Sequence, residues 1–114
     1  MAFSEIELKK IEKFVGALCQ QKTPEKYKNE LRFEYKINAH DVTIYEIRPA
    51  WDDPQKTTEM AIAKLKFTRT KNIWSLYWKR ASGKWELYGP AKNNNDLASL
   101  VGVIKNDAHC CFFG

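Results

Sequence analysis

A group of charged residues in the middle of the chain has types and spacing that could support chemistry. Glu46 and Arg48 lie two residues apart, and Trp51, Asp52 and Asp53 follow shortly afterwards. Carboxylates gathered in this way can hold a divalent metal ion or act as a general base. The first functional hypothesis is therefore an enzyme, a metal-dependent hydrolase or nuclease that uses Glu46, Asp52 and Asp53.

The same charged residues also have a structural interpretation. In a strand, residues two apart share a face, so Glu46 and Arg48 point to the side of Val42 and Ile44. Burying these charges costs several kcal/mol unless they are paired. We therefore interpret Glu46 and Arg48 as an ion pair that holds the following loop, with Asp52 capping a turn. This interpretation is favoured because buried ion networks are common in proteins that catalyse nothing.

A nuclease can be tested further against the order of residues. Metal-dependent nucleases often place an acidic residue on one strand and an acid-x-Lys pair on the next. Lys64-Leu65-Lys66 follows the acidic residues but begins with a base, and Glu34-Tyr35-Lys36 has no aspartate on an earlier strand. The order of these segments argues against a nuclease.

A second candidate site combines lysines and aromatic rings on one face of a sheet. Alternation places Trp74 and Trp78 on one face of their strand and Tyr77 on the other. If the tryptophans are core, the outer face carries Lys64, Lys66, Tyr77 and Lys79, with Tyr88 as a further candidate. Such a face suits single-stranded nucleic acid, through stacking and phosphate contacts. The alternative is an ordinary solvated face with cross-strand aromatic pairs.

A third candidate is the run His109-Cys110-Cys111, with Cys19 or His40 as an additional ligand. Zinc sites usually need four ligands in pairs spaced two to four residues apart, and adjacent cysteines lack that spacing. The alternative is a tail that buries Cys111, Phe112 and Phe113 in the core. We predict no metal, no cofactor and no catalytic residue from this segment.

The elements that must position these residues follow from changes in hydrophobic period. Ser4 and Glu7 form a capping box ahead of an apolar stripe with helical spacing, which predicts a helix from about Glu5 to Gln21. The middle of the chain alternates with period two, and several side chains that can cap a helix precede Leu97. Strands are predicted at 31–37, 42–48, 60–70, 73–80 and 85–88, and a second helix ends at about residue 107.

Bulk composition limits the classes of function. The chain has 114 residues, a formal net charge of +5 and a pI of about 9.1, which favours acidic partners such as nucleic acid. No apolar run approaches the roughly 18 residues of a membrane helix, and the N-terminus lacks a secretory pattern. Three cysteines argue against a disulfide framework. We therefore expect one domain, residues 1–114, in the cytoplasm and outside any membrane.

Three segments together resemble a known bacterial family. They are Glu46-Ile47-Arg48-Pro49-Ala50-Trp51-Asp52-Asp53-Pro54, the tryptophan-rich strands that follow it, and the terminal Cys111-Phe112-Phe113-Gly114; the opening Met1-Ala2-Phe3-Ser4-Glu5 fits as well. The family is known as domain of unknown function family 3024. The resemblance covers nearly the whole chain and implies a small stand-alone bacterial protein. It implies no catalytic residue, cofactor or substrate.

The sequence thus predicts an α+β fold: an N-terminal helix, a five-stranded antiparallel meander and a C-terminal helix, with both helices on one sheet face. For function it favours a non-enzymatic binding module, with nucleic acid as the most plausible partner. The enzyme built on Glu46, Asp52 and Asp53 remains the alternative.

Overall fold

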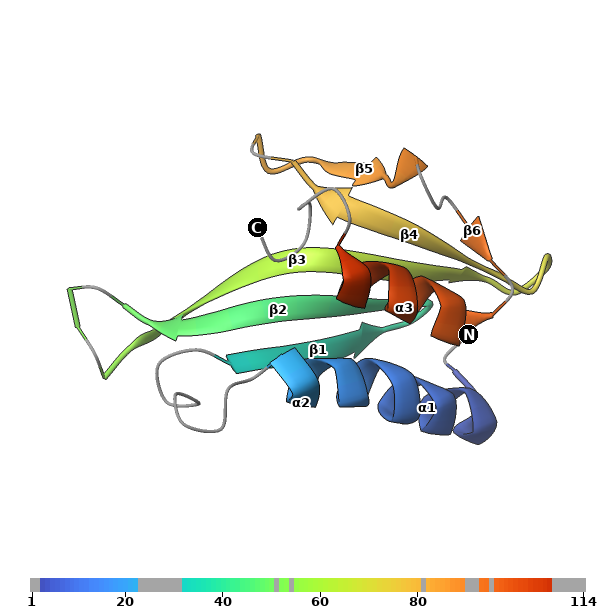
Figure 1. Cartoon of the computed structure of the whole chain (residues 1–114), viewed down its shortest axis with the longest axis horizontal. Helices are drawn as coiled ribbons and strands as arrows, with labels where there is room; N and C mark the ends of the chain where they lie inside the picture. Colours follow the sequence, from blue (N-terminus) through green and yellow to red (C-terminus); the bar gives the residue numbers. More distant parts are fainter. Residues whose placement is uncertain are drawn as a thin grey trace.

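The computed structural model describes residues 3–22, 32–50, 52–53, 55–80, 82–89, 93–94 and 96–107. Figure 1 shows two helical segments lying over one face of a twisted antiparallel sheet. The predicted α+β arrangement is therefore confirmed, including the position of both helices on the same face.

The N-terminal helix forms where its capping residues predict. The backbone N–H of Ser4 donates to Glu7 Oε1 at 2.8 Å, and the Glu7 N–H donates to Ser4 Oγ at 3.2 Å. The helix is continuous but not uniform: α1 (Glu5–Ile11) leads into a π-helical turn (Glu12–Gly16) and then into α2 (Ala17–Lys22). The π-helical turn was not predicted, because the apolar spacing of this segment also fits a regular helix.

The sheet is a meander in which neighbours along the chain pair antiparallel. Its strands run in the order β1 (Arg32–Asn38), β2 (Asp41–Pro49), β3 (Thr57–Thr68), β4 (Ile73–Lys79) and β5 (Trp85–Leu87). A two-residue strand, β6 (Asn93–Asn94), also pairs with β4 and was not predicted. Strand β3 begins earlier than expected, because its polar first residues pair with β2 as far as Pro49 opposite Thr57.

The core lies between the helices and one sheet face. It draws its buried apolar side chains from α1, the π-helical turn, α2, α3 (Leu97–Asn106) and the central strands: Ile11, Val15, Leu18, Val42, Ile44, Leu65, Leu76, Leu100 and Ile104. Trp74 belongs to this core and stacks on Phe3 with ring centroids 5.5 Å apart. The prediction that Trp74 marks the buried face is therefore correct.

Tyr88 also lies in the core, so its placement on the outer face is wrong. Its side chain is 2% exposed, and its backbone N–H donates to the carbonyl of Leu76 at 2.8 Å. Trp85 and Leu87 pair with Lys79 and Tyr77 of the outer face, so the same alternation turns Tyr88 toward the core.

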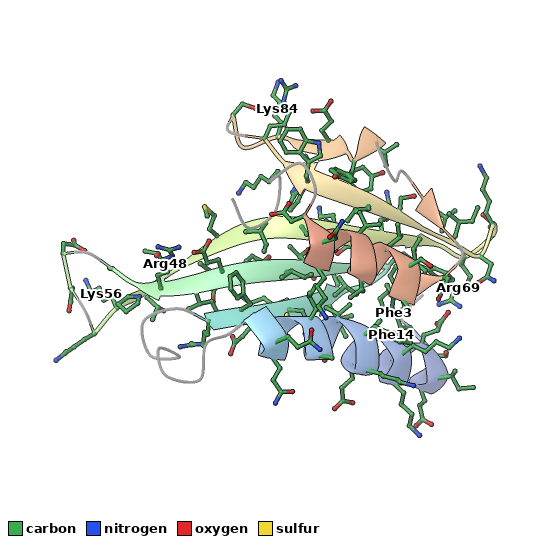
Figure 2. All side chains as sticks on the ribbon, viewed as in Figure 1. Phe3, Phe14, Arg48, Lys56, Arg69 and Lys84 are labelled. Atoms are coloured by element: carbon green, nitrogen blue, oxygen red, sulfur yellow. The ribbon has the colours of Figure 1, made fainter. Side chains whose placement is uncertain are left out.

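The β2–β3 hairpin extends beyond the helices, and Figure 2 shows Arg48 and Lys56 on its projecting end. In this part of the sheet, β3 pairs only with β2, because its ladder with β4 starts at Ala63. Arg48, Asp52 and Asp53 therefore lie on a projecting two-stranded arm, and Glu46 lies at its base, where β2 still pairs with Phe33 of β1. Among the described helices, none combines the length and apolarity needed to cross a bilayer.

Candidate nucleic-acid interface

The outer face of the sheet, opposite the helices, carries the predicted lysines and tyrosine. Lys64 pairs across the sheet with Tyr77, and Lys66 pairs with Ser75. Their chain neighbour Leu65 is fully buried on the opposite face, beneath the helices. Neither helix therefore covers Lys64, Lys66 or Tyr77, which is the geometric condition for any ligand to reach them.

Three of the four predicted residues meet around one shallow hollow of about 190 Å³. Its lining residues are Asp41, Lys64, Lys66, Tyr77 and Trp85. The Lys64 ammonium lies 4.8 Å from the centroid of the Trp85 ring, in a cation–π contact. We call this set the outer-face hollow.

Lys79 lies beside the outer-face hollow but does not line it. It pairs with Trp85 across β4 and β5, and its side chain is half-buried. Its position extends the positive charge along the same face toward the β4–β5 turn.

Sequence reasoning missed two residues of the hollow, Asp41 and Trp85. Asp41 fell between the predicted strands 31–37 and 42–48, and Trp85 fell in a short predicted strand, because the local sequence does not show which side chains surround either residue. Only the strand register places Asp41 opposite Lys66, and Trp85 opposite Lys79. A correct register could have found both, but the sequence pattern predicts faces more firmly than register.

The lysines in and beside the hollow differ from Lys36, which lies on another part of the sheet. Lys36 donates to Glu59 at 2.6 Å and lies over the ring of Tyr45, and the Glu59 hydrogen bond raises the pKa of Lys36. Within the described ranges, Lys64, Lys66 and Lys79 form no ion pair with an acidic side chain. Positive charge that is not neutralised by a partner therefore gathers on the β3–β5 half of the sheet.

The acidic residue of the hollow is in an unusual state. Asp41 Oδ1 is buried, yet it accepts no hydrogen bond from the residues that the structure describes. A buried acceptor without a donor costs about 1–3 kcal/mol, so such atoms are rare in folded proteins.

The charged residues of the hairpin are arranged differently. The Arg48 guanidinium donates to Glu46 Oε1 through both Nε and Nη2, so the predicted pair exists. The burial is unequal: the Glu46 side chain is 12% exposed and the Arg48 side chain 61%. The pair therefore shields one carboxylate rather than forming a fully buried network.

The aspartates beside this pair have separate roles. Asp53 Oδ1 accepts from the backbone N–H of Gln55 at 3.0 Å, so Asp53 caps this turn, a role that was predicted for Asp52. Asp52 is exposed, while Trp51 and Pro54 lie outside the described residues. No three His, Cys, Asp or Glu side chains in the described ranges cluster as metal ligands would.

Cys19 is buried in the core, as a small hydrophobe would be. Burial, with the negative charge of Glu34 as a smaller cause, raises the pKa of Cys19 to about 12. Because the thiolate is the metal ligand and the nucleophile, this environment disfavours both roles. The run His109-Cys110-Cys111 and the tail Phe112–Phe113 lie outside the described residues.

A second hollow, of about 260 Å³, lies between α1, α3 and the β3–β4 end of the core. Its two acids are already engaged. Glu7 accepts from Arg69 at 3.0 Å, and Asp96 caps α3 by accepting from the Ala98 N–H at 3.2 Å. This hollow therefore offers a ligand fewer unsatisfied polar groups than the outer-face hollow does.

Together these features define a small α+β domain with an open antiparallel sheet, helices on one face and a basic, aromatic hollow on the other. The chain matches the family described as Domain of unknown function (DUF3024) over residues 3–114 and belongs to it. The resemblance seen in its motifs is thereby confirmed. Comparisons with curated proteins and with solved structures found no match.

Proposed function

We propose that this chain is a small, non-enzymatic binding module of the bacterial cytoplasm, and that its outer sheet face binds single-stranded nucleic acid. The observation that carries the proposal is the outer-face hollow. It brings lysines that form no ion pair with a described acidic side chain together with Tyr77 and Trp85, on the face that the helices leave uncovered.

The two kinds of side chain would act on different parts of a strand. Lysine ammonium groups neutralise phosphates and release counterions, which supplies affinity without regard to sequence. Aromatic rings stack on bases, at about 1–3 kcal/mol per base. Tyr77 and Trp85 lie on neighbouring strands of the sheet, so the rings and the lysines form one continuous surface.

The enzymatic alternative requires carboxylates that are available to a metal or a substrate. Glu46 is already bound by Arg48, and Asp53 is held in its turn by the backbone of Gln55. These contacts favour structural roles for Glu46 and Asp53, so the binding module is the better supported of the two functions.

The direct test is a fluorescence-anisotropy titration with mixed-sequence single strands at low salt. We expect affinity to fall steeply with added salt, because each phosphate contact releases a counterion. Lys66→Ala should weaken binding to all sequences and flatten the salt slope by about one contact. Tyr77→Ala should cost about 1–3 kcal/mol of binding free energy.

The matched control is Lys105→Ala. Lys105 is exposed on α3, on the helical side of the molecule, and its loss changes the net charge by the same amount. Equal weakening by Lys105→Ala and Lys66→Ala would place binding elsewhere. An absence of binding up to tens of micromolar would leave the face as an ordinary solvated surface.

A further inference from the structure

Asp41 is the residue of the outer-face hollow that a site for phosphates alone does not explain. A carboxylate repels phosphate, and this one costs stability as well because its buried Oδ1 accepts from no donor among the described residues. A site that served only the nucleic-acid backbone would gain from a neutral residue here. The position of Asp41 suggests that the hollow receives a group that donates hydrogen bonds.

The hollow has the size of a small ring system. At about 190 Å³ it holds about six water molecules, given ~30 Å³ for each. Sites for larger organic ligands usually span about 300–1,000 Å³. A single base fits this scale, while the sugar and phosphate would remain on the open sheet beside the lysines.

The polar groups of the hollow have a definite order. The register places Lys66 directly opposite Asp41, so an ammonium donor stands beside a carboxylate with two acceptor oxygens. Guanine presents the complementary set on its pairing edge: a carbonyl acceptor at O6, then donors at N1 and at the 2-amino group. Thymine presents one donor between two carbonyl oxygens. A carbonyl oxygen would therefore lie beside the carboxylate, and two acceptors repel each other.

We infer that the outer-face hollow selects guanine from a single strand. The Asp41 side chain turns its buried Oδ1 toward the hollow, so that the carboxylate accepts from N1–H and the 2-amino group while Lys66 donates to O6. Tyr77 and Trp85 supply the ring contacts, and Lys64, which now covers the Trp85 ring, moves to a neighbouring phosphate. This inference rests on the proposed function and adds base preference to it.

The test compares a thymine oligomer with the same oligomer carrying one guanine, so that no guanine-rich structure can form. The guanine strand should bind about tenfold more tightly, as expected for a paired hydrogen-bond contact. A strand that carries hypoxanthine, which lacks the 2-amino group, should bind with an affinity between those of the guanine and thymine strands. The assay is the same anisotropy titration, at one fixed salt concentration.

The variant Asp41→Asn should affect the two strands differently: it should remove the guanine preference without weakening binding of the thymine strand. An amide replaces one acceptor with a donor, so the guanine preference should collapse to about onefold. Loss of the negative charge should leave binding of the thymine strand unchanged or stronger. Asp52→Asn is the matched control, since Asp52 is an exposed aspartate between β2 and β3, and it should keep the preference.

Each outcome decides between the two proposals. Equal affinity of the parent protein for both strands, or a guanine preference that survives Asp41→Asn, would refute guanine selection and leave strand binding intact. Failure of every strand to bind would refute both.

Discussion

Removal of the Arg48 guanidinium would expose how much the hairpin depends on its ion pair. If both partners were buried, as the sequence pattern predicts, Arg48→Met would cost about 3 kcal/mol or more by leaving a buried carboxylate alone. In the structure only Glu46 is shielded, at 12% exposure, while Arg48 is 61% exposed. Solvent screens the pair from the arginine side, which brings it closer to the 0.2–1 kcal/mol of surface pairs. We therefore expect a loss of about 1 kcal/mol.

The assay is a double-mutant cycle with Glu46→Gln, Arg48→Met and the combined variant, followed by urea unfolding and thermal melts. The coupling energy should be about 1 kcal/mol, and Arg48→Met should lower the Tm by about 3–6 °C for a domain of this size. Arg32 and Glu34 provide a matched control, because they are another pair two residues apart on a strand, with both side chains exposed at 41% and 53%.

Coupling in the control pair should stay below about 0.5 kcal/mol. Equal coupling in the two pairs, or melts of Arg48→Met that match the parent, would refute the structural role of Glu46 and Arg48. A coupling of 3 kcal/mol or more would instead show that solvent does not screen the pair.

Four further predictions concern the rest of the chain. Glu7→Gln should destabilise by up to about 1 kcal/mol at pH 7, because glutamine can keep the capping box but loses the charge that pairs with Arg69, whereas Glu5→Gln should change little; chemical unfolding measures both. Since the Ser4 backbone and Arg69 lower the pKa of Glu7, its advantage should shrink as pH falls below 4.5, which unfolding at several pH values tests. The raised pKa of Cys19 means that the folded state holds a proton that the unfolded state loses above pH 9, so alkali should weaken the fold and peptide mapping should show slow alkylation of Cys19. Truncation after Asp107 should lower the Tm, because it removes apolar tail residues that we predict to be part of the core. Native mass spectrometry that shows one zinc lost with the tail would contradict the core role and indicate a metal site.

Much of the fold could be predicted from the sequence because the hydrophobic period is clear in both helices and in the strands. The errors arose where pairing between strands, rather than the hydrophobic pattern of one strand, decides the structure. Strand β3 starts in the polar residues Thr57–Glu59, which look like loop residues, and it accommodates Ile62 as an extra residue, since Ile44 pairs with Ala63 but Tyr45 pairs with Ala61. Such a bulge depends on the partner strand, so a single strand's sequence does not predict it.

The same distinction applies to the site. Alternation was enough to place Lys64, Lys66 and Tyr77 on the outer face, because the sheet face to which a side chain points is a local property of its strand. Asp41 and Trp85 come from other strands and join the hollow only through register, which is a property of pairs of strands. Roles were harder still to predict: the exposure of Arg48 and the unsatisfied oxygen of Asp41 depend on the whole packed molecule.

The π-helical turn at Glu12–Gly16 has a consequence for the permitted length of the N-terminal helix. An α-helix advances by about 100° for each residue, so one additional residue in a wider turn shifts the phase of everything after it. Ile11 before the turn and Leu18 beyond it are both buried in the same core despite this shift. A chain one residue shorter or longer here would therefore rotate either α1 or α2 out of phase, turning its apolar stripe from the sheet toward solvent.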